Sequence, residues 1–141
     1  MESIVNKSEE LVDEFSFFED WADKYAHIID LGKNMPPLED HWKTPDHLIK
    51  GCQSSVWLHA ELKEGLVYYY ADSDAIIVKG LIGLLVRIFS GQPPAEIVHA
   101  DLSFMNQIGL QQHLSPTRSN GLASMVKQIK MYALAFQANK S

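Results

Sequence analysis

The chain has 141 residues, 46% of them hydrophobic and 21% charged, a composition that fits one globular domain over residues 1–141 and excludes a disordered chain. Its formal net charge of −6, without a cluster of lysine and arginine, argues against nucleic acid as the main partner. The first residues lack an apolar run, and the most apolar stretch, Ala75 to Ser90, is too short to cross a bilayer. Together with a single cysteine, these features predict a protein of the reducing cytoplasm that does not enter membranes.

Two helices are expected in the N-terminal part of the chain. Ser8 to Phe18 opens with a serine and two glutamates, which favour a helix N-terminus. In the segment from about Glu19 to Leu31, apolar residues recur at spacings of three and four, as in an amphipathic helix. Gly32 is expected to end that helix, and Pro36 prevents its continuation.

A long irregular segment and a β-hairpin are expected next. Pro36 to Ser54 has no periodic pattern, and a loop of this length in a compact domain is usually functional or mobile. Hydrophobic and polar residues then alternate from Val56 to Lys63, which predicts a strand. A turn at Glu64-Gly65 leads into the return strand, Leu66 to Ala71, which holds three tyrosines.

The apolar stretch from Ala75 to Ser90 predicts the central core helix, with a cap supplied from the run Asp72 to Asp74. Gly80 and Gly83 lie inside this helix. They do not follow a strand, so they indicate close packing against another helix and not a phosphate-binding loop.

The rear of the chain is expected to be helical. Short turns are predicted at Ala95 to His99 and at Phe104 to Ile108. A last helix is predicted from Asn120 to Gln137, capped by Ser119 or Asn120. The whole pattern predicts an α+β fold in which a small antiparallel sheet packs against helices.

Cys52 is the residue on which the chemistry depends. A lone cysteine cannot form an internal disulfide, and a structural metal site needs several ligands. Gly51 before it, and Gln53 and Ser54 after it, suit an exposed turn and therefore an accessible thiol. The alternative is a small buried hydrophobic residue, which is the common fate of a free cysteine.

Several chemistries are open to this thiol. His41 and His47 on the same loop could complete a metal site, but solvated loop histidines are the better interpretation, so no metal is expected. A cysteine hydrolase would need a base such as His99 or His113, and the local pattern is not of the papain type. Thiol exchange needs only access to a partner's sulfur and shelter for the resulting persulfide.

Three motifs stand together in the chain: Gly51-Cys52-Gln53-Ser54-Ser55-Val56-Trp57, Ala71-Asp72-Ser73-Asp74-Ala75-Ile76-Ile77-Val78-Lys79-Gly80-Leu81, and Leu114-Ser115-Pro116-Thr117-Arg118-Ser119-Asn120-Gly121-Leu122. In this order and spacing they resemble the SufE family, the sulfur-acceptor proteins of iron–sulfur cluster assembly. The resemblance runs from about Phe18 to Phe136, and residues 1–17, expected to be helical, match no motif. It implies a fold similar to that of the IscU scaffold protein, in agreement with the α+β pattern.

The resemblance also implies a function. Cys52 would take persulfide sulfur from a pyridoxal-phosphate-dependent cysteine desulfurase similar to SufS, stimulate that enzyme, and pass the sulfur to an iron–sulfur scaffold similar to SufBCD. The pyridoxal phosphate (PLP) would belong to the desulfurase, so this chain is expected to hold no cofactor and to be the partner of an enzyme, not an enzyme. The related scaffold uses three cysteines, whereas this chain has one, so it should carry sulfur and not build clusters.

Alternatives to the sulfur carrier are a cysteine hydrolase and an adaptor that binds a desulfurase without using the thiol. Either a monomer or a homodimer is compatible with the sequence.

Further site residues follow from the motifs. Those expected to support the Cys52 loop or to bind the partner are Gly51, Gln53, Ser54, Asp72, Ser73, Asp74, Lys79 and Arg118. We expect Cys52 at a loop tip, sheltered by Trp57 and by the start of the core helix. The Asp72 to Asp74 turn would hold this loop in place. Arg118 would lie on the same surface and contact the partner or the persulfide, because a guanidinium stays charged and offers several donors.

Overall fold

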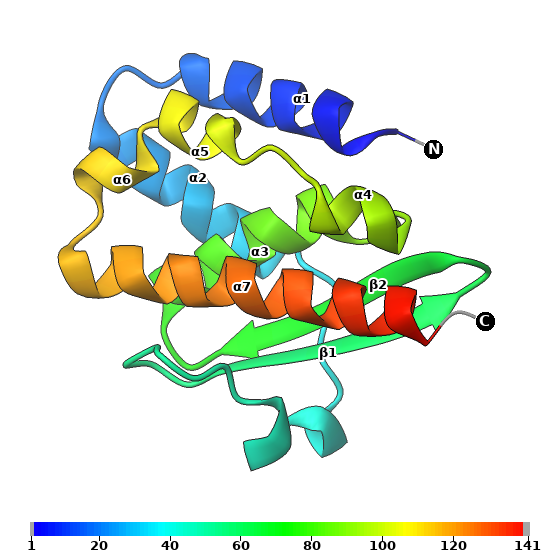
Figure 1. Ribbon diagram of the computed structural model, residues 1–141. Coiled ribbons are helices and arrows are strands. Elements are labelled where there is room, and N and C mark those ends of the chain that lie inside the picture. Colours follow the sequence, from blue (N-terminus) through cyan, green and yellow to red (C-terminus); the bar gives the residue numbers. More distant parts are fainter. Residues whose placement is uncertain (1, 140–141) are drawn as a thin grey trace.

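The computed structural model describes residues 2–139 as an α+β fold, which confirms the expected fold class. Figure 1 shows helices stacked above a single β-hairpin, with two short 3₁₀ turns below it. The elements in chain order are α1 (Ile4–Ser16), α2 (Trp21–Lys33), η1 (Asp40–Trp42), η2 (Pro45–His47), β1 (Val56–Lys63), β2 (Leu66–Ser73), α3 (Ile76–Phe89), α4 (Pro94–Val98), α5 (Ser103–Ile108), α6 (Leu110–His113) and α7 (Pro116–Ala138).

Helix α3 is the centre of the core, as its apolar sequence predicts. It packs against α2 and strand β2, and also touches α1 and α7 (Figure 1). Its most deeply buried side chains are Leu81, Ile82, Leu84, Leu85, Ile88 and Phe89. Because almost every side of this helix is covered, it forms a fixed frame on which the neighbouring loops are placed.

The hairpin has the expected turn at Glu64-Gly65 and a slightly longer second strand than predicted. Strands β1 and β2 pair antiparallel from Val56↔Ser73 to Lys63↔Leu66, two residues beyond the predicted end at Ala71. Alternate residues of both strands are buried against the helices. The Tyr69 hydroxyl donates a 2.7 Å hydrogen bond to the Ile129 carbonyl, which ties the sheet to α7.

Helices α2 and α3 approach one another closely at glycines. A methyl group at Gly80 would overlap the Ile28 carbonyl oxygen, and one at Gly32 would lie 2.7 Å from the Gly80 nitrogen. The close packing predicted for Gly80 is therefore confirmed. The prediction that Gly32 ends its helix is wrong: α2 continues to Lys33, and Gly32 serves to admit the neighbouring backbone.

The predicted N-terminal caps of α1, α3 and α7 are also wrong. Helix α1 begins at Ile4, because Ser3 accepts a hydrogen bond from the Asn6 N–H at 3.1 Å, and Ser8 lies inside the helix. Helix α3 follows Ala75 without a side-chain cap, because the polar side chains before it are engaged elsewhere.

Helix α7 begins at Pro116, not at Asn120. Its N-cap is Ser115, whose hydroxyl accepts a hydrogen bond from the Arg118 N–H at 3.2 Å. A proline in the first turn of a helix is favourable, since its missing N–H has no partner to lose there. Arg118 is thus in the first helical turn and not in a loop. Helix α6 was not predicted.

Candidate functional site

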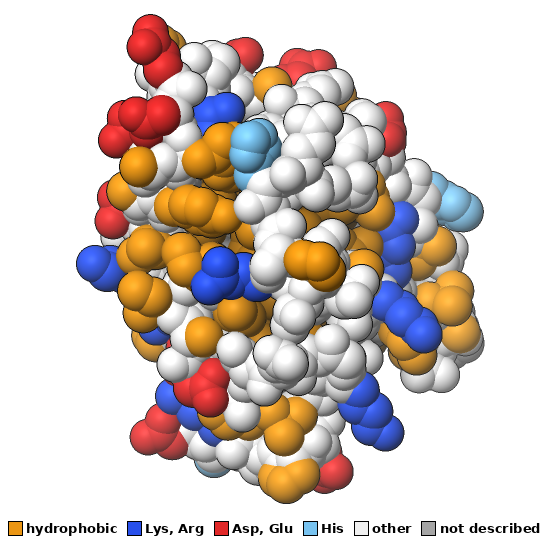
Figure 2. All heavy atoms as spheres, turned by 90° about the vertical axis from the view of Figure 1, so that its left-hand side faces the viewer, with side chains coloured by type: hydrophobic (Ala, Val, Ile, Leu, Met, Phe, Trp, Pro, Cys, Tyr) orange, Lys and Arg blue, Asp and Glu red, His pale blue; other side chains and the backbone are white. Residues whose placement is uncertain are grey.

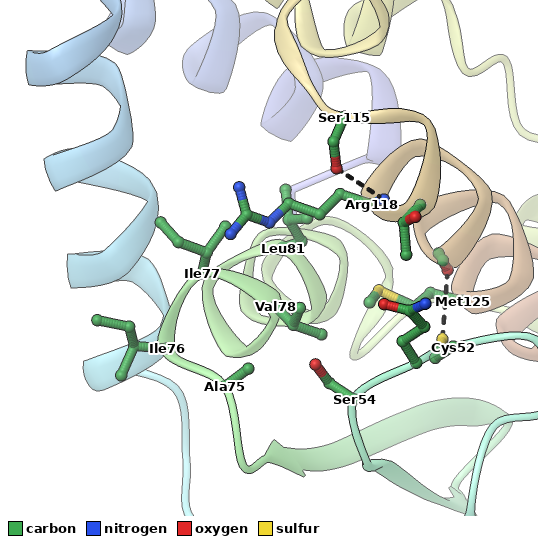
Figure 3. A pocket seen from close by; sticks show the side chains of 13 residues that line it. Cys52, Ser54, Ala75, Ile76, Ile77, Val78, Leu81, Ser115, Arg118 and Met125 are labelled. Carbon is green, nitrogen blue, oxygen red and sulfur yellow. Dashed lines mark hydrogen bonds between the residues drawn. The ribbon is translucent and has the colours of Figure 1, made fainter.

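Cys52 lies in the wall of a cavity of about 570 Å³ between the Cys52 loop, the start of α3 and the start of α7 (Figure 3). The cavity combines apolar and uncharged polar side chains with a single charged one, Arg118. The lining residues are Cys52, Gln53, Ser54, Ala75, Ile76, Ile77, Val78, Leu81, Ser115, Thr117, Arg118, Gly121 and Met125. Residues far apart in the sequence thus meet at the only cysteine.

The Cys52 thiol is half-buried and protonated at rest. Its Sγ–H donates a weak hydrogen bond to the Gly121 carbonyl of α7, with 3.6 Å between sulfur and oxygen. Burial raises the pKa of the thiol. Because the Gly121 carbonyl oxygen carries a partial negative charge, this environment favours the neutral thiol and disfavours the thiolate, which is the nucleophile.

Gly51 allows the loop to lie directly on α7. Its φ of +91° is a conformation that other residues adopt at a cost, and a Cβ at this position would lie 2.5 Å from the Ser124 hydroxyl oxygen. The positive φ therefore favours a glycine before Cys52, and any side chain at this position would also displace the Ser124 hydroxyl.

The turn after β2 holds the other end of the Cys52 loop. The Ser73 hydroxyl donates to the Ser55 carbonyl at 2.8 Å, and Asp74 Oδ1 accepts from the Ser55 N–H at 3.1 Å. The Asp74 N–H also donates to the Ser55 carbonyl at 3.2 Å. The structure thus places this turn beside the loop, and these bonds explain why neither side chain caps α3.

Asp72 forms two ion pairs next to this turn. Its carboxylate lies 2.7 Å from Lys43 Nζ and 3.3 Å from Lys79 Nζ. Partial burial works against ionisation, but the hydrogen bonds from Lys43, the Ser73 N–H and Lys79 keep the pKa of Asp72 below its usual range. Asp72 and Lys79 therefore join α3, the hairpin and the segment before Cys52, and neither lines the cavity.

Arg118 lies at the rim of the cavity. Figure 3 shows its side chain reaching from α7 across the opening towards Ile77 on α3. Within residues 2–139 its guanidinium forms no ion pair, so its charge is available to another molecule. Figure 2 shows that hydrophobic side chains gather on this face of the molecule, with lysine and arginine among them.

The apolar part of the site was identified from the sequence only at the start of α3, which was expected to shelter Cys52 and does line the cavity. Ile76 in the first turn of α3 is 66% exposed, and Ile77 and Met125 line the cavity. Isoleucines in an exposed first turn, where polar residues are usual, were the available signal. Trp57, expected to shelter Cys52, does not line the cavity; it forms a bridge with Leu48 instead.

The histidines proposed as a base or as metal ligands lie away from Cys52. No histidine or carboxylate lines the described cavity. His99 borders a groove between α1 and α4, and the ring of His113 stacks on Trp21 with 4.2 Å between centroids. In the described part of the chain no three potential metal ligands come together.

None of the helices described between residues 2 and 139 is both long enough and apolar enough to cross a membrane.

Comparison with known proteins identifies the family. The SufE family model, described as "Fe-S metabolism associated domain", matches residues 9–133, and so begins within α1, earlier than the motifs themselves. An uncharacterized SufE-like protein of Rhizobium meliloti (strain 1021) is 40% identical over 130 residues, which cover 89% of this chain and 93% of the relative. A second uncharacterized SufE-like protein, from Rhizobium etli, is 39% identical over 127 residues, 86% of each chain.

The fold also occurs among solved structures. The solution structure of a hypothetical protein from Thermus thermophilus is similar with a TM-score of 0.78, covering 94% of this chain and 97% of that one. At 19% identity this match supports the fold alone. The family match and the two relatives together show that the chain belongs to the SufE family, whose domain is associated with Fe–S metabolism and sulfur transfer.

Proposed function

We propose that this protein accepts persulfide sulfur on Cys52 from a PLP-dependent cysteine desulfurase and passes it to an iron–sulfur scaffold. The observation that carries this proposal is the position of the only cysteine of the sequence, in the wall of a cavity of about 570 Å³ whose described lining holds no carboxylate and no histidine. Sulfur transfer between cysteines needs an accessible thiolate and a sheltered product, and no catalytic base fixed in the acceptor.

The transfer step is a thiol–persulfide exchange. The Cys52 thiolate attacks the outer sulfur of the desulfurase persulfide, a new S–S bond forms on Cys52, and the desulfurase cysteine leaves as a thiolate. The proton lost by Cys52 is released, and no external oxidant or reductant is needed. The PLP stays in the desulfurase, where it supplies the chemistry that removes sulfur from free cysteine.

The resting site suits a carrier that reacts only when it is docked. The hydrogen bond to Gly121 and the partial burial keep Cys52 neutral, which also limits its oxidation. Outward movement of Cys52 would break that bond and return the thiol to solvent, where thiolate forms more readily. Docking of the desulfurase is proposed to drive this movement.

The surface around the cavity offers contacts for the desulfurase. Exposed Ile76 supplies apolar area, and the unpaired Arg118 supplies a charge that can bind a carboxylate or the persulfide anion. The proposal also includes stimulation of desulfurase turnover, passage of the sulfur to a SufBCD-like scaffold, and action as a monomer or homodimer. It further includes location in the cytoplasm, which the free thiol supports.

Mass spectrometry of the intact protein tests the proposal. After incubation with cysteine and a desulfurase, we expect one added sulfur atom on the wild type and none on Cys52→Ser. Cys52→Ala should keep the fold, since the side chain lies on a loop, but should lose sulfur acceptance. An adaptor that works without the thiol would be indicated if the alanine variant stimulated the desulfurase as well as the wild type.

Alkylation gives an independent test of docking. Iodoacetamide should modify Cys52 slowly in the free protein and faster when the desulfurase is present, because docking moves the thiol outward. Equal rates would contradict the proposed movement. Failure of the persulfide to accumulate, with steady hydrolysis of an ester substrate, would favour the hydrolase.

A further inference from the structure

An aromatic cluster fastens the segment before Cys52 to the outer face of the hairpin. The two 3₁₀ turns lie against β1, below the sheet in Figure 1. Trp42 stacks on His59 of β1 with 3.7 Å between ring centroids and 12° between planes. His47 packs against both, with centroids 5.2 Å from Trp42 and 5.3 Å from His59. We call Trp42, His47 and His59 the aromatic strap.

The strap holds the upstream end of the Cys52 loop. Immediately after His47, Leu48 bridges to Trp57, and the Ile49 N–H donates a 2.8 Å hydrogen bond to the Val56 carbonyl. Cys52 follows three residues later. Asp74 and Ser73 hold the downstream end at Ser55, so release of the strap would weaken the upstream end alone, where the Lys43–Asp72 ion pair would remain.

We propose that the aromatic strap is a proton-sensitive fastening, in which protonation of His47 releases the segment 40–50 from the hairpin and makes Cys52 easier to reach. The link to sulfur transfer rests on the proposed function of Cys52; the release itself does not.

The charges around the two histidines differ. His59 has a carboxylate to receive its charge, since its Nε2 lies 3.1 Å from Glu61 Oε2, although Lys63 shares that carboxylate at 3.2 Å. Tyr70 of β2 faces the same ring with 6.3 Å between centroids. Within the strap, His59 is therefore the histidine that has a carboxylate partner.

A positive charge on His47 would have few anionic groups near it. Its Nδ1 lies 2.9 Å from the Thr44 hydroxyl oxygen, and the one acid of its own turn, Asp46, is exposed. The other groups that face it are those of His41 and His59 and, across a shallow groove against α7, Lys50, Lys127 and Tyr132. Protonated His47 would thus be surrounded mostly by cations or groups that become cationic.

The sign of the pH effect follows from this environment. Burial, and then the charge of His59, lower the pKa of His47 in the folded protein, while Asp46 opposes them in part. A free histidine has a pKa of about 6.5, so the strap keeps its full stability above that pH. It loses stability as the pH falls below about 6.5 towards the folded value, because the released segment binds the proton more tightly.

The experiment compares Cys52 alkylation in the wild type and in His47→Phe between pH 7.5 and 5.5. Phenylalanine keeps an aromatic ring in the strap but cannot be protonated. The thiolate fraction falls with pH in both proteins, so it cancels in the ratio of their rates. We expect the ratio of the wild-type alkylation rate to the variant rate to rise as the pH falls from 7.5 to 5.5. The rise should reach at most about tenfold, which is the limit for one histidine that takes no proton while it is packed in the strap.

His99→Phe is the matched control. It removes a histidine that lies in the groove between α1 and α4, away from the strap, so the ratio of its alkylation rate to that of the wild type should not change with pH. If His47→Phe folds poorly, His47→Gln replaces it. A second measurement needs no variant: hydrogen exchange of the Ile49 amide in the wild type, compared with that of the core amide of Ile129. Ile49 should lose relative protection as the pH falls.

Two results would overturn the proposal: a rate ratio for His47→Phe that stays constant with pH, or an Ile49 amide whose relative protection does not change. If Cys52 carried no sulfur but the ratio of alkylation rates still rose, the proton-sensitive strap would be supported and the proposed function would be contradicted. The two proposals are therefore tested separately.

Discussion

Helix α3 meets its neighbours in two very different ways. Where it crosses α2, the backbones are so close that Gly80 has no room for a methyl group beside Ile28. At its N-terminal end, where it approaches α7, a cavity of about 570 Å³ remains beside Cys52. The difference indicates a division of roles: the crossing fixes the frame, and the open end leaves the space that the proposed loop movement and the proposed addition of sulfur would need.

The largest effect is expected from breaking the crossing. Gly80→Ala places a methyl group on the Ile28 backbone, which cannot move without separating α2 from α3, so we expect a loss of about 3 kcal/mol in the free energy of unfolding. Urea denaturation measures it. Gly83→Ala is the matched control, since its Cβ would lie 3.0 Å from the Leu31 carbonyl oxygen, a milder contact. Equal stability of Gly80→Ala and the wild type would contradict the tight crossing.

A smaller but more local effect is expected at the loop. Gly51→Ala introduces strain at a φ of +91° and a clash with Ser124, at a cost of about 1–3 kcal/mol. The loop should lift from α7, and Cys52 should be alkylated faster in the free protein. Gly65→Ala, at a φ of +81° in open space, measures the strain alone and should leave the alkylation rate unchanged.

Asp74→Ala tests the downstream end of the loop. It removes the acceptor for the Ser55 N–H, which should cost about 1 kcal/mol and increase the alkylation rate of Cys52. Asp74→Asn keeps a side-chain oxygen in the same place and should behave more like the wild type. If both variants alkylated at the wild-type rate, this bond would have no part in holding the loop.

The smallest effect on stability is expected at the rim of the cavity. Arg118→Ala should change the free energy of unfolding by no more than about 0.5 kcal/mol, because the residue is exposed and forms no ion pair with residues 2–139. It should nevertheless slow desulfurase-dependent sulfur loading of Cys52, as measured by mass spectrometry. Arg118→Lys keeps the charge without the planar fork, and an intermediate rate would separate the two contributions. Unchanged loading by Arg118→Ala would remove this residue from the site.

Much of the fold could be predicted because its strongest signals are local. The alternation over Val56 to Lys63 matches β1 residue for residue, and the apolar run after Ala75 becomes α3. The starts of α1 and α7 were missed because several serines compete as caps, and the choice of Ser3 and Ser115 depends on where the chain must turn in the folded protein.

The candidate site was predictable only in part. The motifs point to Cys52 and Arg118, yet nothing local in the sequence shows that the two share one cavity, since α3 and α7 bring them together. His47 was predicted to be a solvated loop residue; it does lie in the loop, in η2, but it is only partly exposed, because the loop folds back and His47 packs against Trp42 and His59. Contacts of this kind, between a loop and a strand, leave no periodic pattern in the sequence and so could not be predicted from it.

A sheet of two strands consists entirely of edges, and in this one a short backbone bridge covers part of each edge. Leu48 covers β1 at Trp57, and Gln92 covers β2 at Val67. Unpaired strand edges readily add a strand from another chain, which is how many aggregates begin. Outward movement of the segment around Leu48 would uncover β1 at that point. The proposed open form of the Cys52 loop would therefore also be the form more prone to aggregation when no partner is bound.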